Sequence, residues 1–351
     1  MKSASWPRKA LEHHAEVAMK KLTINEIAEK AGVSKTTVSF YLNGKTNKMS
    51  EETKQRIQQI IDETGYEPSA AARAMKAKSS AMLGVILDDV SKPFEAQALK
   101  GIEETARASG YQILIGNSDL NFNTEKEYIE QMVKCGAEGF IIQSTYRFGM
   151  LAASLEKKKK PLVYLGTRPY DVKGRYVKSN HYECVYQMVT GCIAKGYNAF
   201  VMVAGDASDI SAGFEKTRGY KDALQDAGLE GSSCYFTEQA RSGDVFEQLK
   251  LLVDLTKKTL IYVAEPELLP VVYQAIRNYP DYQKLFPDTL GLIGFDMTGW
   301  TRLTTPAISA ILEPACQEGV RAAKELLELL DGKRKEGEVV FKNVIKWRET
   351  T

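Results

Sequence analysis

The stretch from residue 20 to residue 78 constrains this chain most, because it holds three short helical patterns together with their start and stop signals. Thr23 and Glu26, three residues apart, form a capping-box pattern that predicts the start of a helix. Apolar residues then recur at helical spacing along one face: Ile24, Ile27, Ala28 and Ala31. Gly32 interrupts this pattern and predicts a tight turn.

Two further helices are predicted after this turn. Ser34 is placed to cap the second helix, and Ser50 to cap the third. The second helix would bury Val38, Tyr41 and Leu42 and expose Lys35, Thr36, Ser39, Phe40 and Asn43. Two helices joined by a glycine-containing turn are typical of a helix-turn-helix, whose second helix enters the major groove of DNA. A small helical bundle with a solvated polar face fits the spacing equally well.

A longer run of residues decides between these interpretations: Thr23-Ile24, Glu26-Ile27-Ala28, Ala31-Gly32-Val33-Ser34, Thr37-Val38-Ser39, Leu42-Asn43-Gly44, Ser50, Thr53, Arg56-Ile57, Gly65-Tyr66 and Pro68. On these residues the segment resembles the N-terminal domain of the LacI/GalR family of bacterial transcription regulators. The resemblance implies a domain over residues 19–67 that binds double-stranded operator DNA. The residues expected at the DNA are Thr23, Ser34, Lys35, Thr36, Thr37, Ser39, Phe40, Asn43, Lys45, Tyr66, Ala72 and Met75.

Residues 68–78 follow the head as an alanine-rich segment that is too short to be a stable helix alone. The resemblance implies a hinge helix that orders on DNA, where Met75 would take the place of the family's leucine as an apolar wedge in the minor groove. A flexible linker is the simpler alternative. Residues 1–18 precede the usual family start, and we expect them to form a disordered extension.

Charge is spread unevenly along the chain. Residues 20–78 hold 11 lysines and arginines against 7 acidic residues, whereas the whole chain has a net charge of only +2. A basic head on a mildly acidic body is consistent with an anionic partner at one end. No apolar run approaches membrane-spanning length, and the 5 scattered cysteines include no C-x-x-C pair, so we expect a cytoplasmic protein with reduced thiols.

From residue 82 onward, apolar strand patterns alternate with amphipathic helical patterns, and the same plan begins again near residue 199. This alternation predicts an α/β body with parallel sheets that are covered on both faces. By resemblance it is a two-lobed body like the periplasmic binding proteins, with a dimerisation role and three crossovers between the lobes. The expected first lobe covers about residues 79–178 and 312–337, and the second about 179–311 and 338–351.

No persuasive catalytic, metal or cofactor constellation is present, and we predict that the chain is not an enzyme. Ligands of open α/β sheets bind at the carboxyl ends of the strands, and two facing lobes form a cleft there. The predicted effector-binding residues are Phe94, Thr145, Arg168, Lys216, Arg218, Glu265 and Asp296. Asp296 matches the family's effector-binding aspartate, while Arg168, Lys216 and Arg218 suggest an anionic ligand such as a sugar acid or phosphosugar.

The predicted function is therefore a homodimeric repressor that binds operator DNA and responds to a small, sugar-like metabolite in the cleft. Two alternatives also fit the sequence. The same regulator could respond to a phosphocarrier protein instead of a metabolite. More remotely, the α/β body could belong to a sugar-processing enzyme.

Overall fold

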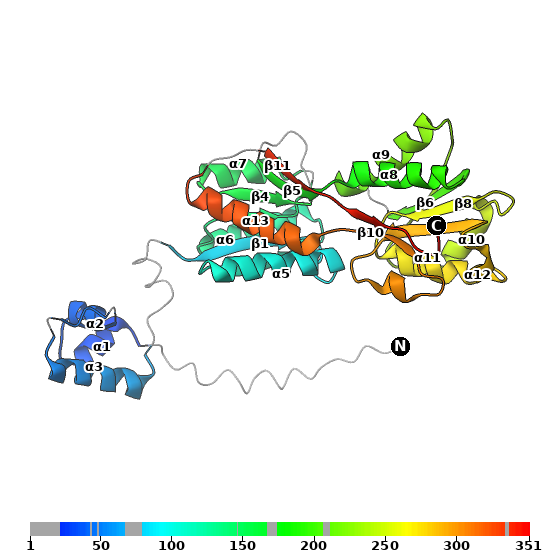
Figure 1. Ribbon diagram of the computed structural model, residues 1–351. Coiled ribbons are helices and arrows are strands. Elements are labelled where there is room, and N and C mark those ends of the chain that lie inside the picture. Colours follow the sequence, from blue (N-terminus) through cyan, green and yellow to red (C-terminus); the bar gives the residue numbers. More distant parts are fainter. Residues whose placement is uncertain are drawn as a thin grey trace. The chain divides into compact units, whose positions relative to one another are not determined.

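A computed structural model describes residues 22–42, 44–47, 49–66, 79–145, 147–166, 174–205, 211–333 and 337–351 (Figure 1). The chain divides into two compact units, Met1–Ser80 and Ala81–Thr351, which are referred to below as the head and the body. The predicted extension of residues 1–18 and the predicted hinge of residues 68–78 lie outside the described residues.

The described head consists of three helices around a small apolar core, as predicted. The helices are α1 (Ile24–Lys30), α2 (Lys35–Leu42) and α3 (Glu51–Thr64). The capping box is present, with the Thr23 N–H donating to Glu26 Oε2 at 2.6 Å. Gly32 adopts a positive φ of 61° in the turn between α1 and α2. The fully buried core residues are Ile27, Ala28, Ala31, Val38 and Ile57.

The first lobe of the body is a six-stranded parallel sheet in the order β11-β5-β4-β3-β1-β2. Its strands are β1 (Met82–Leu87), β2 (Gln112–Asn117), β3 (Phe140–Ile142), β4 (Leu162–Leu165), β5 (Arg175–Ser179) and β11 (Gly337–Phe341). One face packs against α5 (Pro93–Ala108) and α13 (Ala315–Leu330), and the other against α6 (Phe122–Lys134) and α7 (Gly149–Lys157). The predicted sheet, buried on both faces, is therefore confirmed for this lobe.

The second lobe repeats this plan with the order β12-β10-β9-β8-β6-β7. Its strands are β6 (Ala199–Gly205), β7 (Ser232–Phe236), β8 (Thr259–Val263), β9 (Leu290–Phe295), β10 (Ser309–Leu312) and β12 (Val344–Lys346). Helices α8 (His181–Ala194) and α9 (Ser211–Asp226) cover one face, and α10 (Ser242–Leu252) and α11 (Leu268–Ile276) the other. The short helices α12 (Tyr282–Leu285) and η3 (Trp300–Leu303) complete it. Strand β12 is antiparallel to β10, an exception to the predicted parallel pairing.

Two features of the strands differ from the prediction. Strand β5 was not foreseen, because its short segment lacks a continuous apolar run. The predicted lobe boundary between residues 337 and 338 falls inside β11, which pairs with β5 in the first sheet. The chain therefore passes from the first lobe to the second after Phe341. In the same region the Asn180 side chain accepts a hydrogen bond from the Asn343 N–H at 2.8 Å, which ties two crossovers together.

Helices α5 and α13 touch through their backbones. A Cβ atom on Gly101 would lie 2.2 Å from the carbonyl oxygen of Cys316, and one on Gly319 would lie 2.0 Å from that of Ala98. Only glycine leaves room for so close a crossing of the two helices. Within the described part of the chain, no helix is both long and apolar enough to span a bilayer.

Candidate functional site

The exposed surface of α2 is the first candidate site. Ser34 caps the helix, because its Oγ accepts the Thr37 N–H at 3.1 Å. Lys35 and Thr36 are exposed, and Ser39 is half-buried on the same helix. This arrangement leaves a row of short polar side chains and one lysine at the surface, which suits contacts to base edges and phosphates.

Phe40 is the unusual member of this surface. Its side chain is 48% exposed and lies outside the apolar core of the head, whereas the neighbouring Tyr41 packs against that core. The sequence of residues 32–50 contains three lysines and no acidic residue, so the phosphate backbone of DNA meets no like charge there. An exposed aromatic ring on this face can contact a thymine methyl group.

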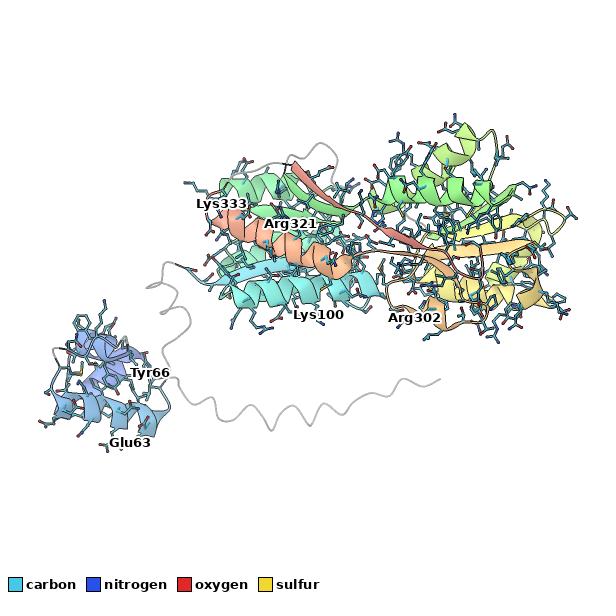
Figure 2. The ribbon with its side chains drawn as sticks, viewed as in Figure 1. Glu63, Tyr66, Lys100, Arg302, Arg321 and Lys333 are labelled. Atoms are coloured by element: carbon cyan, nitrogen blue, oxygen red, sulfur yellow. The ribbon has the colours of Figure 1, made fainter. Side chains whose placement is uncertain are left out.

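The other predicted DNA-binding residues occupy different environments. Lys45 is exposed after α2, and the Thr23 hydroxyl accepts the Glu26 N–H in the cap of α1. Tyr66 packs against the apolar core just beyond the end of α3 (Figure 2). The predictions for Asn43, Ala72 and Met75 lie outside the described residues.

The second candidate site is a cavity of about 510 Å³ lined by both lobes of the body. It opens at the carboxyl ends of the strands, the position predicted for a ligand. Carboxyl groups dominate its described lining: Asp88, Asp89, Glu95, Asp119, Glu238, Glu265, Glu267 and Glu313. The basic side chains in that lining are Lys92 and Lys216, and aromatic surface comes from Phe94 and Phe236.

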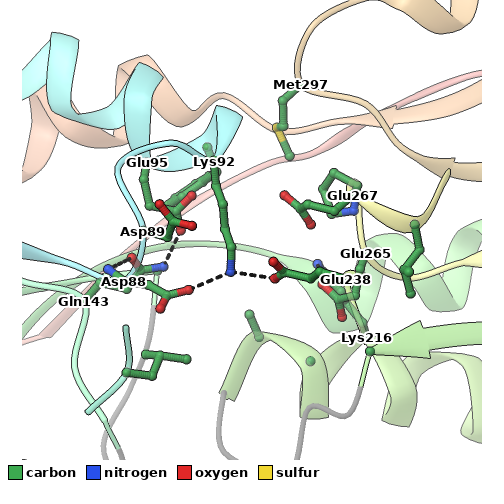
Figure 3. Close-up of a pocket in the computed structure, with 18 of the residues that line it drawn as sticks. Asp88, Asp89, Lys92, Glu95, Gln143, Lys216, Glu238, Glu265, Glu267 and Met297 are labelled. Atoms are coloured by element: carbon green, nitrogen blue, oxygen red, sulfur yellow. Dashed lines mark hydrogen bonds and ion pairs between the residues drawn. The ribbon is translucent and has the colours of Figure 1, made fainter. Parts of the chain in front are cut away.

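Lys92 joins the two lobes through this cavity (Figure 3). Its ammonium lies 2.9 Å from Asp88 Oδ2 of the first lobe and 2.8 Å from Glu238 Oε1 of the second. Burial lowers the pKa of Lys92, but the hydrogen bonds to Glu238 and Asp88 outweigh this effect and raise it above its ordinary value. Lys92 is therefore a fully charged cation held between two carboxylates.

Glu95 lies beside this ion pair on α5 and is almost completely buried. The Gln143 amide donates to Glu95 Oε1 at 2.8 Å and accepts the Asp88 N–H at 2.9 Å. Burial raises the pKa of Glu95 to about 7, although the Gln143 hydrogen bond opposes this shift. Burial also raises the pKa of Glu267 across the cavity.

Lys216 and His181 line the cavity from the second lobe. The Lys216 ammonium donates to the Ala264 carbonyl at 3.1 Å, lies 3.6 Å from Glu265 Oε2, and sits 4.2 Å from the centre of the Phe295 ring. His181 Nε2 lies 2.8 Å from Glu313 Oε1, and both side chains are buried. His181 Nδ1 has no hydrogen-bond partner among the residues that the structure describes.

The cavity brings together three of the predicted effector-binding residues, namely Phe94, Lys216 and Glu265. Thr145 is instead buried below it, donating through its N–H and hydroxyl to Glu125 at 2.7 and 2.8 Å. Arg218 lies on a separate surface and pairs with Asp222 at 3.2 Å. The prediction for Arg168 lies outside the described residues.

Asp296 is also absent from the described lining of the cavity. Its carboxylate faces its own loop, where it accepts the N–H groups of Thr298 at 2.9 Å, Gly299 at 2.8 Å and Thr301 at 3.3 Å. The structure thus shows Asp296 anchoring its own loop, and its contact with a ligand stays a prediction. The adjacent Met297 is the residue of this loop that reaches the cavity.

Sequence reasoning missed several lining residues, above all Lys92, Glu95 and Glu238. The spacing of four residues between Asp88 and Lys92 was only a weak signal, because these residues flank a turn before α5 and the four-residue rule for ion pairs applies within helices. Glu238 carried no comparable signal, because it comes from the other lobe. The described lining offers the predicted anionic ligand two ammonium groups among eight carboxyl groups, and the charge of the ligand stays a prediction.

Comparison with known proteins places these two sites in a family. A family model described as bacterial regulatory proteins, lacI family, matches residues 23–69. A model of periplasmic binding proteins and the sugar binding domain of the LacI family matches residues 80–242, and a periplasmic binding protein-like domain matches residues 189–351. The chain belongs to the LacI family. Both the predicted family and the predicted fold class are confirmed.

Curated relatives of this LacI-family chain are transcription regulators. The probable regulator EndR of Paenibacillus polymyxa is 28% identical over 90% of this chain and 93% of its own length. Catabolite control protein A of Priestia megaterium is 28% identical over 94% of this chain and 99% of its own length. The chain is accordingly a DNA-binding transcription regulator and not an enzyme, as the sequence predicted.

Two solved structures share the LacI-family fold. The lac repressor dimer bound to operator and the anti-inducer ONPF matches with a TM-score of 0.76 at 19% identity, over 94% of this chain and 99% of that one. A complex of the transcriptional regulator CelR with cellobiose matches with a TM-score of 0.65 at 21% identity, over 94% of this chain and 100% of that one. At these identities the likeness establishes the fold alone.

Proposed function

We propose that this LacI-family regulator is a homodimeric repressor that binds a roughly palindromic operator through α2 and is switched by a small polar ligand in the cavity between its lobes. DNA binding is supported by one observation: α2 exposes a surface without acidic residues within a head of three helices. Two heads in a dimer would read two half-sites, so the operator would share the symmetry of the protein.

The inter-lobe cavity supports control by a small molecule. Its volume of about 510 Å³ and its polar and aromatic lining suit a sugar-sized ligand. A ligand that contacts both lobes binds one arrangement of them better than another, and it shifts the population toward that arrangement. The CelR relative was solved with cellobiose, which supports a polyhydroxylated ligand of similar size for this chain.

The test is selection of binding sites by the full chain from a random DNA pool, followed by gel shifts on the enriched sequence. We expect a two-fold symmetric consensus and an affinity that falls steeply as salt rises, because phosphate contacts release counterions. Lys35→Ala should weaken binding to all sequences and lower the salt slope by about one. Lys30→Ala, an exposed lysine at the end of α1, serves as the charge-matched control. Enrichment of no sequence over the starting pool would contradict the proposal.

A further inference from the structure

We propose that the ligand of the cavity is an organic cation, a polar molecule bearing an amine or guanidine group, and that Lys92 is the internal cation with which it competes. This inference rests on the ligand-controlled regulator proposed above and names the chemical class of its ligand. It reverses the anionic ligand suggested by the sequence.

The charge of the cavity favours a cationic ligand. Eight carboxyl groups and two ammonium groups line its described part, and six carboxylates still face the two cations when Glu95 and Glu267, whose pKa values burial raises, are neutral. An anionic ligand would have to enter against this field, whereas a cation is attracted by it.

Lys92 already occupies the position that a cationic ligand would take. Its ammonium bridges Asp88 of one lobe and Glu238 of the other at 2.9 and 2.8 Å, and this is how a cationic ligand would link the lobes (Figure 3). A free amine arriving in the cavity would satisfy the same carboxylates. The Lys92 ammonium therefore competes with the ligand for Asp88 and Glu238, and substitution of Lys92 would leave both carboxylates to the ligand.

The lining also suits the hydrogen-bonding and aromatic contacts of a cation. Its carboxylate oxygens offer acceptors to a ligand rich in N–H donors, and Phe94 offers an aromatic ring that can lie against a cation.

An organic cation fits this lining better than a metal ion. The described residues contain no group of three or more histidine, cysteine, aspartate or glutamate side chains placed to hold a metal. The carboxyl groups are instead spread around a volume of about 510 Å³, large enough for a molecule of sugar size. Such spacing suits a ligand whose charged nitrogen reaches one cluster while its hydroxyl groups reach others.

The experiment measures binding of three matched probes to the full chain by thermal shift and calorimetry. Glucamine, sorbitol and gluconate share a six-carbon polyol skeleton and differ in charge at one end, and arginine and putrescine extend the cationic set. We expect the best cation to bind at least about tenfold more tightly than sorbitol, gluconate not to bind measurably, and the preference for cations to weaken with added salt.

Replacing Lys92 should change ligand affinity in opposite directions for cationic and anionic ligands. Lys92→Met should strengthen binding of the cationic probes about tenfold, because it releases Asp88 and Glu238. If Lys92 instead served to bind an anion, the same variant would weaken that binding. Lys100→Met is the matched control, since Lys100 lies exposed on α5, the helix that Lys92 precedes, and is not among the residues that line the cavity (Figure 2).

Several results would overturn the inference. These are tighter binding of gluconate than of glucamine, no stabilisation by any of the cations, or weaker cation binding by the Lys92→Met variant. Gel shifts on the selected operator, made with the same protein preparation, show whether the protein still binds DNA. They therefore distinguish rejection of the cationic ligand from rejection of the proposed regulator. Intact operator binding with a preference for sorbitol or gluconate would retain the regulator and reject only the cationic ligand.

Discussion

Replacement of Asp296 by alanine tests whether this residue anchors its loop or contacts the ligand. The residue is only 3% exposed, and its carboxylate accepts three backbone N–H groups as well as the hydroxyls of Thr298 and Thr301. Thr301 Oγ1 also accepts from the Arg348 guanidinium at 2.9 Å, which extends the network to the last residues of the chain. Loss of the carboxylate would leave these donors without their acceptor.

The expected loss of stability is large. An unsatisfied buried donor costs roughly 1–3 kcal/mol, and water reaches some of this loop, so we expect Asp296→Ala to lower the free energy of unfolding by about 3–5 kcal/mol. That corresponds to a decrease of roughly 10 °C in the melting temperature of a lobe-sized unit. Asp296→Asn keeps one acceptor oxygen and should lose about 1–2 kcal/mol.

The loss of stability caused by Asp296→Ala should depend on pH, because the same hydrogen bonds shift the pKa of Asp296. Burial favours the neutral acid, but the hydrogen bonds from Thr301, Thr298 and Gly299 outweigh it and hold the pKa of Asp296 below its usual range. A carboxyl group with a lowered folded-state pKa stabilises the protein above its unfolded-state pKa and loses that contribution as the pH falls. The penalty of Asp296→Ala should therefore be complete at pH 7 and shrink below about pH 4.

The assay is thermal unfolding of the full chain at several pH values, with Asp288→Ala as an exposed control from the segment just before β9. Asp288→Ala should leave the melting temperature of the body unchanged. An Asp296→Ala variant with wild-type melting behaviour and no ligand binding would refute the anchoring role. Such a result would restore Asp296 to the ligand site predicted from the sequence.

Three other substitutions have clear expectations. Gly319→Ala should destabilise the first lobe by about 1–3 kcal/mol or more in thermal unfolding, because its Cβ would meet a backbone carbonyl of α5. Gly243→Ala is the control, because a Cβ there would meet open space, and equal melting temperatures of the two variants would contradict this expectation. Thr145→Val should cost about 1–2 kcal/mol in the same assay, because Glu125 loses a hydroxyl partner, and no loss would argue against this buried pair. Phe40→Arg should change the preferred base at one symmetric position of each half-site by roughly 1–3 kcal/mol, and identical consensus sequences would return Phe40 to a purely structural role.

The sequence predicted the parts of this fold that depend on local signals. The capping box at Thr23 and the glycine turn at Gly32 lie where their spacing indicated, because caps and turns are set by neighbouring residues. The two runs of apolar strands also predicted the two sheets. Strand β5 was missed because its half-buried, mixed sequence resembles a loop. The predicted boundary between the lobes at residues 337 and 338 falls inside β11, because the partner of an edge strand depends on distant strands.

The candidate ligand site was less predictable, for a physical reason. Residues at strand ends could be identified, but not the direction in which each side chain points. Lys216 turns into the cavity, whereas Asp296 turns back to its loop. The pairing of Lys92 with Glu238 depends on how the two lobes meet, which no spacing along the chain encodes.

The placement of β11 and β12 also determines the order in which this protein can fold during synthesis. Each is the edge strand of a different sheet, and both lie beyond residue 336. The ribosome must therefore make nearly all of the described body before either lobe can complete its sheet. The head forms its core from residues 22–66 and can fold far earlier. A message cut short before β11 would thus yield a chain with a finished head and two lobes that both lack an edge strand.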